Sequence, residues 1–427
     1  MKTVHRIIRN IRVMDPSDGF DAVTDLAVAG GRIVARGTLP PDFTAEEVLN
    51  GTGLIACPGF IETSFQAHTP GHGRDGDLAS ELRAAVAGGV TQVLLRPDTL
   101  PMADIPAVLQ EQRVLAERLA LANVHLSGAL TTQLQGAALT EMAGLAEAGA
   151  IAFSQAKEPV LSAALLRLAL SYAADLGLPV LLHGEQPELA ANGVMHEGRL
   201  SIRLGLTGRP AAAEQIGVQR DIAIAALSAC PIHFPHLSIA AAVAEVAAAR
   251  QRGEPVTCGV SIHHLLLTEQ DVGFFNLHAK ILPPLRAAAE RDALRHAIAT
   301  GAITAISSDH SPWGVDREGM TFTQAPFGIA AVEWLLPLAL RLMDEGVLDL
   351  MTVLNLLSVG PAQALGLPVP SLAVGATADL CIFDPESYFT VEPGRQWSRG
   401  RNLPYGQWEL RGQVRYTLVA GRMVFRG

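Results

Sequence analysis

The sequence predicts an α/β fold: a TIM-type (β/α)8 barrel with a small β-sandwich domain formed by both chain termini. Short apolar runs alternate with amphipathic segments between residues 58 and 369. Eight such units can be counted, which is the number that closes a parallel barrel. Both ends of the chain instead carry short alternating segments separated by turn residues, which is typical of antiparallel strands.

The eight predicted barrel strands are short and rich in apolar and β-branched residues. In chain order they are Gly59–Thr63, Val90–Arg96, Asn123–Ala129, Ala150–Ser154, Pro179–His183, Ile232–Leu237, Pro255–Val260 and Ala302–Ser308. Helical patterns lie between them, for example at Ile105–Ala122 and Leu161–Gly177. In the second of these, Leu165, Leu168, Ala169 and Tyr172 have the 3/4 spacing of a helix face. Functional groups of such a barrel lie on the loops that follow the strands.

The two ends of the chain are expected to form one β-rich domain. The first part, residues 1–57, contains alternating segments at His5–Val13, Thr24–Ala29 and Arg32–Ala35. The second part, residues 370–427, repeats the pattern at Leu380–Phe383, Val414–Val419 and Met423–Phe425. The barrel between them is predicted to occupy residues 58–369.

Composition narrows the class of protein. The chain has 427 residues, 49% of them hydrophobic, but it has no uninterrupted apolar run of 18, so no membrane span is expected. A net charge of −10 argues against nucleic acid or an anionic membrane as partner. The four cysteines form no Cys-x-x-Cys pair, and no signal peptide is recognised at the N-terminus. We therefore expect a cytoplasmic protein with free, buried thiols.

Three polar residues follow predicted strands in a way that indicates a site. His183 ends one strand, His236 lies near the end of the next, and Asp309 follows the last. Two imidazoles and one carboxylate on one rim could bind a divalent metal such as zinc or orient a water molecule. A single strand-end histidine is more often structural, so the indication comes from the three together.

Motifs along essentially the whole chain resemble the dihydroorotase family, in the order and with the spacing of that family. Among them are Pro58-Gly59-Phe60-Ile61, His183-Gly184-Glu185, Pro283-Pro284-Leu285-Arg286, Asp309-His310-Ser311-Pro312 and Gly375-Ala376-Thr377-Ala378-Asp379-Leu380. The resemblance implies a metal centre that activates water to attack the amide of dihydroorotate. The reverse reaction closes carbamoyl aspartate.

The resemblance also implies six metal-ligand positions, and three of them do not carry ligands. The positions are Ser64, Gln66, Gln155, His183, His236 and Asp309. Histidine is expected at the first two, and a bridging carboxylate at the third. A hydroxyl and two neutral amides are poor replacements for imidazole and carboxylate. His68 and His72 are expected on a loop and are not expected to substitute.

The positions that would hold the substrate have changed as well. His68 stands where the family has an arginine, Trp313 where it has a histidine, and Asp98 and Leu282 where it has asparagines. A negative charge at Asp98 is expected to repel an anionic substrate.

The leading interpretation is a catalytically inactive dihydroorotase-like protein of pyrimidine biosynthesis with no metal at full occupancy. The resemblance is greatest to family members that assemble with aspartate carbamoyltransferase, so a homo- or hetero-oligomer with that enzyme is expected. The alternative is a zinc-dependent cyclic amidohydrolase with one zinc ion held by His183 and His236 and with Asp309 as general base. A hydantoinase- or allantoinase-like activity ranks last, because it depends on the missing histidine pair. Without a metal, Asp309 and His310 are expected to have structural roles.

Overall fold

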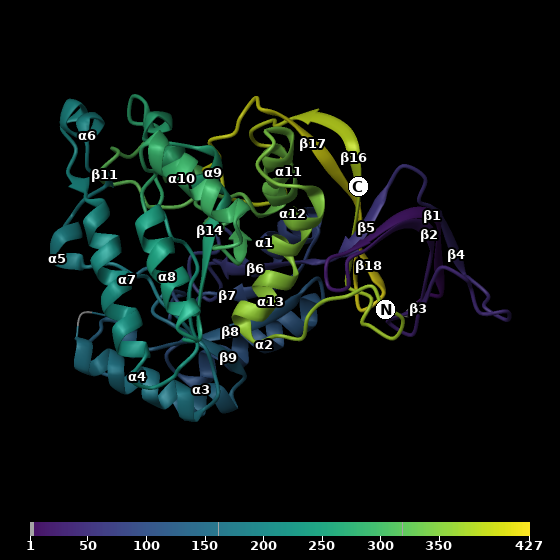
Figure 1. Ribbon diagram of the computed structural model, residues 1–427, viewed down its shortest axis with the longest axis horizontal. Helices are drawn as coiled ribbons and strands as arrows, with labels where there is room; N and C mark the ends of the chain where they lie inside the picture. The colour runs from purple at the N-terminus through teal and green to yellow at the C-terminus, as the bar shows by residue number, and fades with distance from the viewer. Residues whose placement is uncertain (1–3, 161, 318) are drawn as a thin grey trace.

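The structure is a computed structural model that describes residues 4–160, 162–317 and 319–427. Its larger part is a parallel sheet surrounded by helices, and its smaller part is a second sheet that contains strands from both ends of the chain. Figure 1 shows the purple N-terminal strands and the yellow C-terminal strands side by side, away from the helices α4, α7 and α8. Among the described residues, no helix is both long and apolar enough to cross a membrane.

The parallel sheet contains all eight strands predicted for the barrel. They pair in the order β15-β14-β13-β10-β9-β8-β7-β6. Their bounds are β6 (Phe60–Phe65), β7 (Val90–Leu95), β8 (Asn123–Ala129), β9 (Ala150–Ser154), β10 (Val180–Leu181), β13 (Ile232–Phe234), β14 (Val256–Ser261) and β15 (Ala305–Ser307). The main difference from prediction is length: β10, β13 and β15 are shorter. Pro179 cannot donate to a ladder, which explains the late start of β10.

The first and last strands of this sheet are held together by contacts at their carboxyl ends. The backbone N–H of Gln66 donates to the carbonyl of His310 at 2.9 Å. The N–H of Ser308 donates to the carboxylate of Glu62 at 2.7 Å. The loops that follow β6 and β15 therefore lie beside each other, which is what places residues 64 and 309 in one site.

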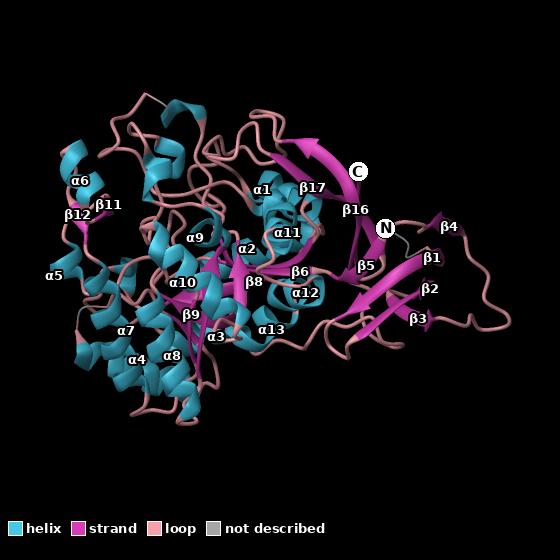
Figure 2. Ribbon diagram, turned by 45° about the horizontal axis from the view of Figure 1, so that its top comes forward, coloured by secondary structure: helices cyan, strands magenta, loops and turns pink. Residues whose placement is uncertain are grey.

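Helices cover the outside of the parallel sheet (Figure 2). Their bounds are α1 (Leu78–Ala87), α2 (Pro106–Leu119), α3 (Met142–Glu147), α4 (Ala163–Asp175), α7 (Ala211–Ala225), α8 (Ala240–Gln251), α10 (Ala288–Ala299), α11 (Leu335–Asp344), α12 (Leu350–Leu357) and α13 (Val359–Leu365). Shorter elements near the site are α5 (Pro187–Ala190), α6 (Arg199–Leu204), α9 (Ile262–Leu266) and the strand pair β11 (Met195–His196) and β12 (Gly208–Arg209). The single-turn helices are η1 (Thr132–Leu134), η2 (Glu269–Val272), η3 (Leu277–Ala279), η4 (Val315–Arg317) and η5 (Val332–Trp334).

Helix α4 corrects one detail of the sequence analysis. Leu161, the predicted first residue, lies outside the described residues, and the helix is capped by Ser162, whose side chain accepts from the N–H of Leu165. Its buried face consists of Leu166, Ala169, Leu170 and Ala173, whereas the predicted Leu168 is 58% exposed. The 3/4 spacing is present, but the face is displaced by about one residue, because an Ala-Leu-rich helix offers two apolar stripes.

The terminal strands form one continuous sheet rather than two stacked sheets. Its strands pair in the order β18-β17-β16-β5-β1-β2-β3, and β4 pairs with β1. The bounds are β1 (Arg6–Asp15), β2 (Phe20–Ala29), β3 (Arg32–Arg36), β4 (Glu47–Asn50), β5 (Ile55–Pro58), β16 (Leu380–Thr390), β17 (Glu409–Val419) and β18 (Arg422–Arg426). Ile11, Leu26, Ile382 and Leu418 share one buried cluster, so the sheet curls around its own core. Both termini thus form one small β domain, as predicted, and its strands are joined in one sheet.

Candidate functional site

A pocket lies at the carboxyl ends of the parallel strands, where the sequence analysis placed the site. Its lining includes Ser64, Arg96, Lys157, His183 and His236. Three of these were predicted site residues, but Arg96 and Lys157 were not. These two residues bring two cations into the lining of the pocket.

The central contact of the site joins Lys157 to Asp309. The Lys157 ammonium donates to Oδ2 of Asp309 at 2.8 Å, and the Asp309 side chain is 1% exposed. Oδ1 of the same carboxylate lies 3.6 Å from Nε2 of His236 and 3.9 Å from Nη1 of Arg96. The hydroxyl of Ser64 also reaches Oδ1, at 3.5 Å. Asp309 is therefore the shared anion of a mostly buried cluster.

The loops that carry this pair have unusual backbone conformations. Asp309 has a φ of 46°, and Ala156, which precedes the lysine, has a φ of 53°. Left-handed backbone is tolerated by aspartate but is costly for alanine. The turn at Ala156 is stabilised by a hydrogen bond from its N–H to the hydroxyl of Ser154 at 3.0 Å. This turn directs Lys157 into the pocket directly after β9.

Arg96 changes the interpretation of Asp98. The guanidinium of Arg96 forms an ion pair with Asp98, with Nε 3.1 Å from Oδ1, and also donates to the hydroxyl of Ser311 at 2.8 Å. The amide of Gln66 donates to Oδ2 of Asp98 at 3.0 Å. Arg96 therefore balances the charge of Asp98, which weakens the repulsion expected from that carboxylate alone.

The replaced ligand positions make contacts of their own. The amide of Gln155 is turned to the hydroxyl of Thr131, with contacts of 2.7 and 3.0 Å, and its side chain is buried. Gln66 is engaged with Asp98, as described above. Ser64 contacts Asp309. The structure thus brings Ser64 and Asp309 together and directs Gln66 and Gln155 to other partners.

The side chains of the two retained histidines are mostly buried, and the Nε2 atom of each has no hydrogen-bond partner among the described residues. His183 Nε2 lies 3.6 Å from Glu185, whose carboxylate also pairs with Arg209. Burial alone would raise the pKa of Glu185, but His183 and Arg209 lower that pKa to about 2. Glu185 therefore stays ionised and orients toward His183 rather than toward Asp309.

The electrostatics of the cluster favour an ionised carboxylate and a neutral imidazole. Burial alone would raise the pKa of Asp309, but the Lys157 and Arg96 cations hold it well below its usual range. Burial lowers the pKa of His236 to about 3, and the Lys157 and Arg96 cations act in the same direction. Burial also lowers the pKa of Lys157, and Asp309 opposes that shift. At neutral pH Asp309 is therefore an anion paired with the ammonium.

The four predicted substrate positions lie outside the lining of this pocket. The ring of His68 donates from Nε2 to the carbonyl of Pro312 at 2.9 Å. Trp313 is buried and stacks on His278 with ring centroids 5.7 Å apart. Leu282 precedes Pro283, whose carbonyl accepts from His264 at 3.2 Å. His68 and Trp313 thus have packing or hydrogen-bonding partners inside the protein.

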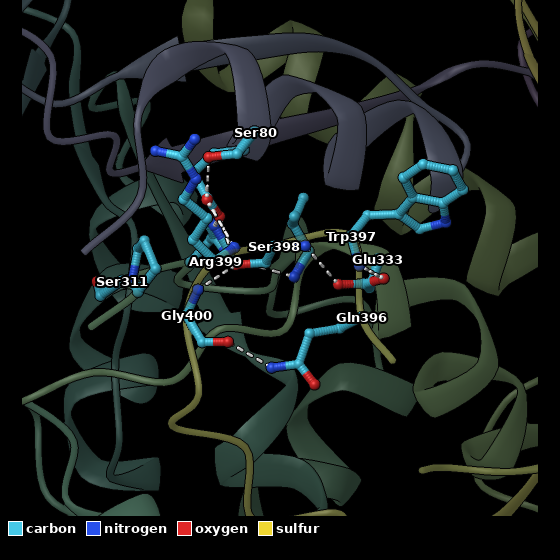
Figure 3. Close-up of polar contacts among 12 residues, drawn as sticks. Ser80, Ser311, Glu333, Gln396, Trp397, Ser398, Arg399 and Gly400 are labelled. Carbon is cyan, nitrogen blue, oxygen red and sulfur yellow. Dashed lines mark hydrogen bonds and ion pairs between the residues drawn. The ribbon is translucent and has the colours of Figure 1, made fainter. Parts of the chain in front are cut away.

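His310 and its neighbours connect the site to the C-terminal segment. Nε2 of His310 donates to Glu81 at 2.8 Å, and Glu81 also accepts from the N–H of Arg399 at 3.1 Å. Figure 3 shows the segment Gln396–Gly400, in which the N–H groups of Trp397 and Ser398 point to the buried carboxyl of Glu333. A structural role for His310, one of those weighed from the sequence, agrees with these contacts.

The residues that the sequence analysis missed are Arg96, Lys157 and Glu62. The signal for Arg96 and Lys157 was present, because each follows or ends a predicted strand as the recognised residues do. Lys157 is also one of only three lysines in the chain. Glu62 lies within β6, and its role becomes visible only when β15 is placed beside it. Burial raises the pKa of Glu62 to about 7 although Ser308 and Ser64 donate to it.

The residues present do not fit the metal centre implied by the resemblance. Within the described ranges, no group of three or more His, Cys, Asp and Glu side chains is arranged to hold a metal ion. The unpartnered Nε2 atoms of His183 and His236 are what remains of a ligand set. An ammonium already lies against Asp309, the one carboxylate of that set. A divalent cation would meet like charge there.

Comparisons with known proteins decide the family. The model of the "Amidohydrolase family" matches residues 55–424. This chain is a dihydroorotase-like member of the amidohydrolase family. It is 42% identical over 422 residues to a "Dihydroorotase-like protein" of Pseudomonas aeruginosa, covering 98% of this chain and 99% of the relative. It is 37% identical over 422 residues to a "Dihydroorotase" of Geobacter sp., with the same coverage.

Solved structures give the same fold at lower identity. The L-hydantoinase (dihydropyrimidinase) of Arthrobacter aurescens has a TM-score of 0.87 at 22% identity, covering 99% of this chain and 96% of that one. A D-hydantoinase of Thermus sp. has a TM-score of 0.81 at 22% identity, covering 99% and 95%. At this identity the likeness concerns the fold alone.

Proposed function

We propose that this dihydroorotase-like protein is catalytically inactive and acts as a structural partner of aspartate carbamoyltransferase in cytoplasmic pyrimidine biosynthesis. The observation that carries the first half is the contact of Lys157 with Asp309 at 2.8 Å. It engages the carboxylate that a metal would need, and three further ligand positions hold Ser64, Gln66 and Gln155. The proposal includes closure of the parallel sheet into a (β/α)8 barrel, supported by the contacts between the ends of β6 and β15.

The partner half of the proposal rests on the family resemblance and on what the chain has kept. A dihydroorotase-like chain without a metal centre still folds a large barrel with a terminal sheet, and a buried ion-pair cluster stands where the chemistry would be. A subunit whose role is to complete an oligomer needs its fold and its surface, but it needs no reaction of its own. We therefore propose a homo- or hetero-oligomer that contains aspartate carbamoyltransferase.

A turnover assay tests the inactivity directly. The purified chain, with and without added zinc, is expected to give no hydrolysis of dihydroorotate and no cyclisation of carbamoyl aspartate above the uncatalysed rate. The physical reason is that Ser64, Gln66 and Gln155 are poor ligands for the metal that would activate water and polarise the amide. A dihydroorotase that has its full ligand set, assayed in parallel, serves as the control. Zinc-dependent turnover by this chain would contradict the proposal.

The alternative function is a cyclic amidohydrolase with one zinc ion. It is favoured by one observation, the buried and unpartnered Nε2 atoms of His183 and His236. In that case these two atoms would hold the ion, which would activate the attacking water, and Asp309 would accept a proton. Tight binding of one zinc per chain that is lost on His183→Ala substitution would favour this alternative.

A further inference from the structure

We propose that the ammonium of Lys157 is the resident cation of this site and excludes a metal even when the missing ligands are supplied. The inference rests on the proposed function and names a further reason why the site does not hold a metal. The replaced ligands are then only part of that reason. A new positive charge, built into the chain, accounts for the rest.

Lys157 lies on the loop that follows β9. The resemblance places the bridging ligand at Gln155, on the loop that follows β9. In this chain the Gln155 amide is turned to Thr131, and the left-handed backbone at Ala156 brings the residue two positions later into the pocket. The loop thus places a cation in the pocket, where the resemblance implies an anion.

The ammonium of Lys157 lies against a buried carboxylate. Its partner is Asp309, which is 1% exposed and which the resemblance assigns as a metal ligand. Asp309 also has a left-handed backbone, with a φ of 46°. An ammonium and a metal ion are alternative counter-ions for one buried carboxylate, and both cannot lie within contact distance of it without strong repulsion.

The charges of the cluster also disfavour a bound divalent ion. Lys157 and Arg96 supply two positive charges, and Asp309 and Asp98 supply two negative ones, with contacts of 2.8 Å from Lys157 to Asp309 and 3.1 Å from Arg96 to Asp98. The charges of these four side chains balance. A divalent ion would leave two uncompensated positive charges in a mostly buried place, which is unfavourable. The neutral imidazole of His236 cannot offset them.

Grafting the ligands with and without Lys157 tests the inference. The triple variant Ser64→His, Gln66→His, Gln155→Asp is expected to retain little zinc after dialysis against micromolar zinc. The same variant with Lys157→Met added is expected to bind zinc at least about a hundredfold more tightly, because one adjacent positive charge is removed. Adding Lys157→Arg to the triple variant is the matched control. It keeps the charge and is expected to stay zinc-poor.

The readouts are zinc per chain by elemental analysis and the zinc-dependent rise in melting temperature. Stoichiometric zinc in the triple variant with Lys157 in place would overturn the inference, as would absence of zinc uptake on adding Lys157→Met. If the multiple variants do not fold, Gln155→Asp is compared with Gln155→Asp, Lys157→Met in the same assays, with the same expected difference. Dihydroorotate turnover by the unmodified chain would refute the proposed function instead, so the two failures are distinguishable.

Discussion

Replacing Asp309 with asparagine is expected to lower the free energy of unfolding by about 3–5 kcal/mol. The substitution leaves the Lys157 ammonium mostly buried without its counter-ion at 2.8 Å. Asparagine adopts the left-handed backbone of position 309 as readily as aspartate, so strain does not account for the loss. Urea unfolding followed by circular dichroism gives the measurement.

A double-mutant cycle identifies the cause of that loss. Lys157→Met alone leaves Asp309 with Arg96 and His236 nearby and is expected to cost less than Asp309→Asn. The variant that carries both changes has no uncompensated charge at this contact and is expected to recover stability relative to Asp309→Asn alone. Equal loss in the double variant and in Asp309→Asn would show that the pair is not coupled.

Aspartate carbamoyltransferase from the same organism, expressed without this chain, is expected to lose most of its activity, by roughly tenfold or more at working concentrations. The reason is mass action: if the active oligomer requires the dihydroorotase-like subunit, its absence leaves subunits that do not assemble. The measurement is carbamoyl aspartate formation after expression of the enzyme alone and together with this chain, with size-exclusion chromatography of both samples.

A pocket variant provides the matched control for that experiment. Ser64→Ala removes a 3.5 Å contact to Asp309 and leaves the outer surface of the protein unchanged. It is expected to support the transcarbamoylase as well as the unmodified chain does, because a substitution inside the pocket does not change the surface available to a partner. Full activity of the transcarbamoylase in the absence of this chain would remove the partner half of the proposal.

Much of the fold could be predicted because its signals are local. The eight strands of the parallel sheet follow from short apolar runs, and α2 begins at Pro106, as expected of proline in a first helical turn. The curl of the terminal sheet could not be predicted, because it depends on contacts between side chains of β1 and β16, which are far apart in the sequence. Local patterns contain no information on such pairings.

The site was predicted in its position but not in its electrostatics. Strand-end polarity located His183, His236 and Asp309, and the resemblance located the replaced ligands. The neutralisation of Asp98 by Arg96 depends on side-chain direction, which spacing does not determine. The reach of Lys157 depends on the left-handed turn at Ala156, and alanine gives no sequence signal for such a turn.

We propose that the Lys157 ammonium stands where the family resemblance implies a metal ion. Anomalous diffraction at the zinc absorption edge, from crystals grown with zinc, tests this proposal. We expect no anomalous peak between His183, His236 and Asp309, and density for the Lys157 side chain within hydrogen-bonding distance of Asp309. A zinc peak ligated by the two histidines, with Lys157 displaced, would contradict it.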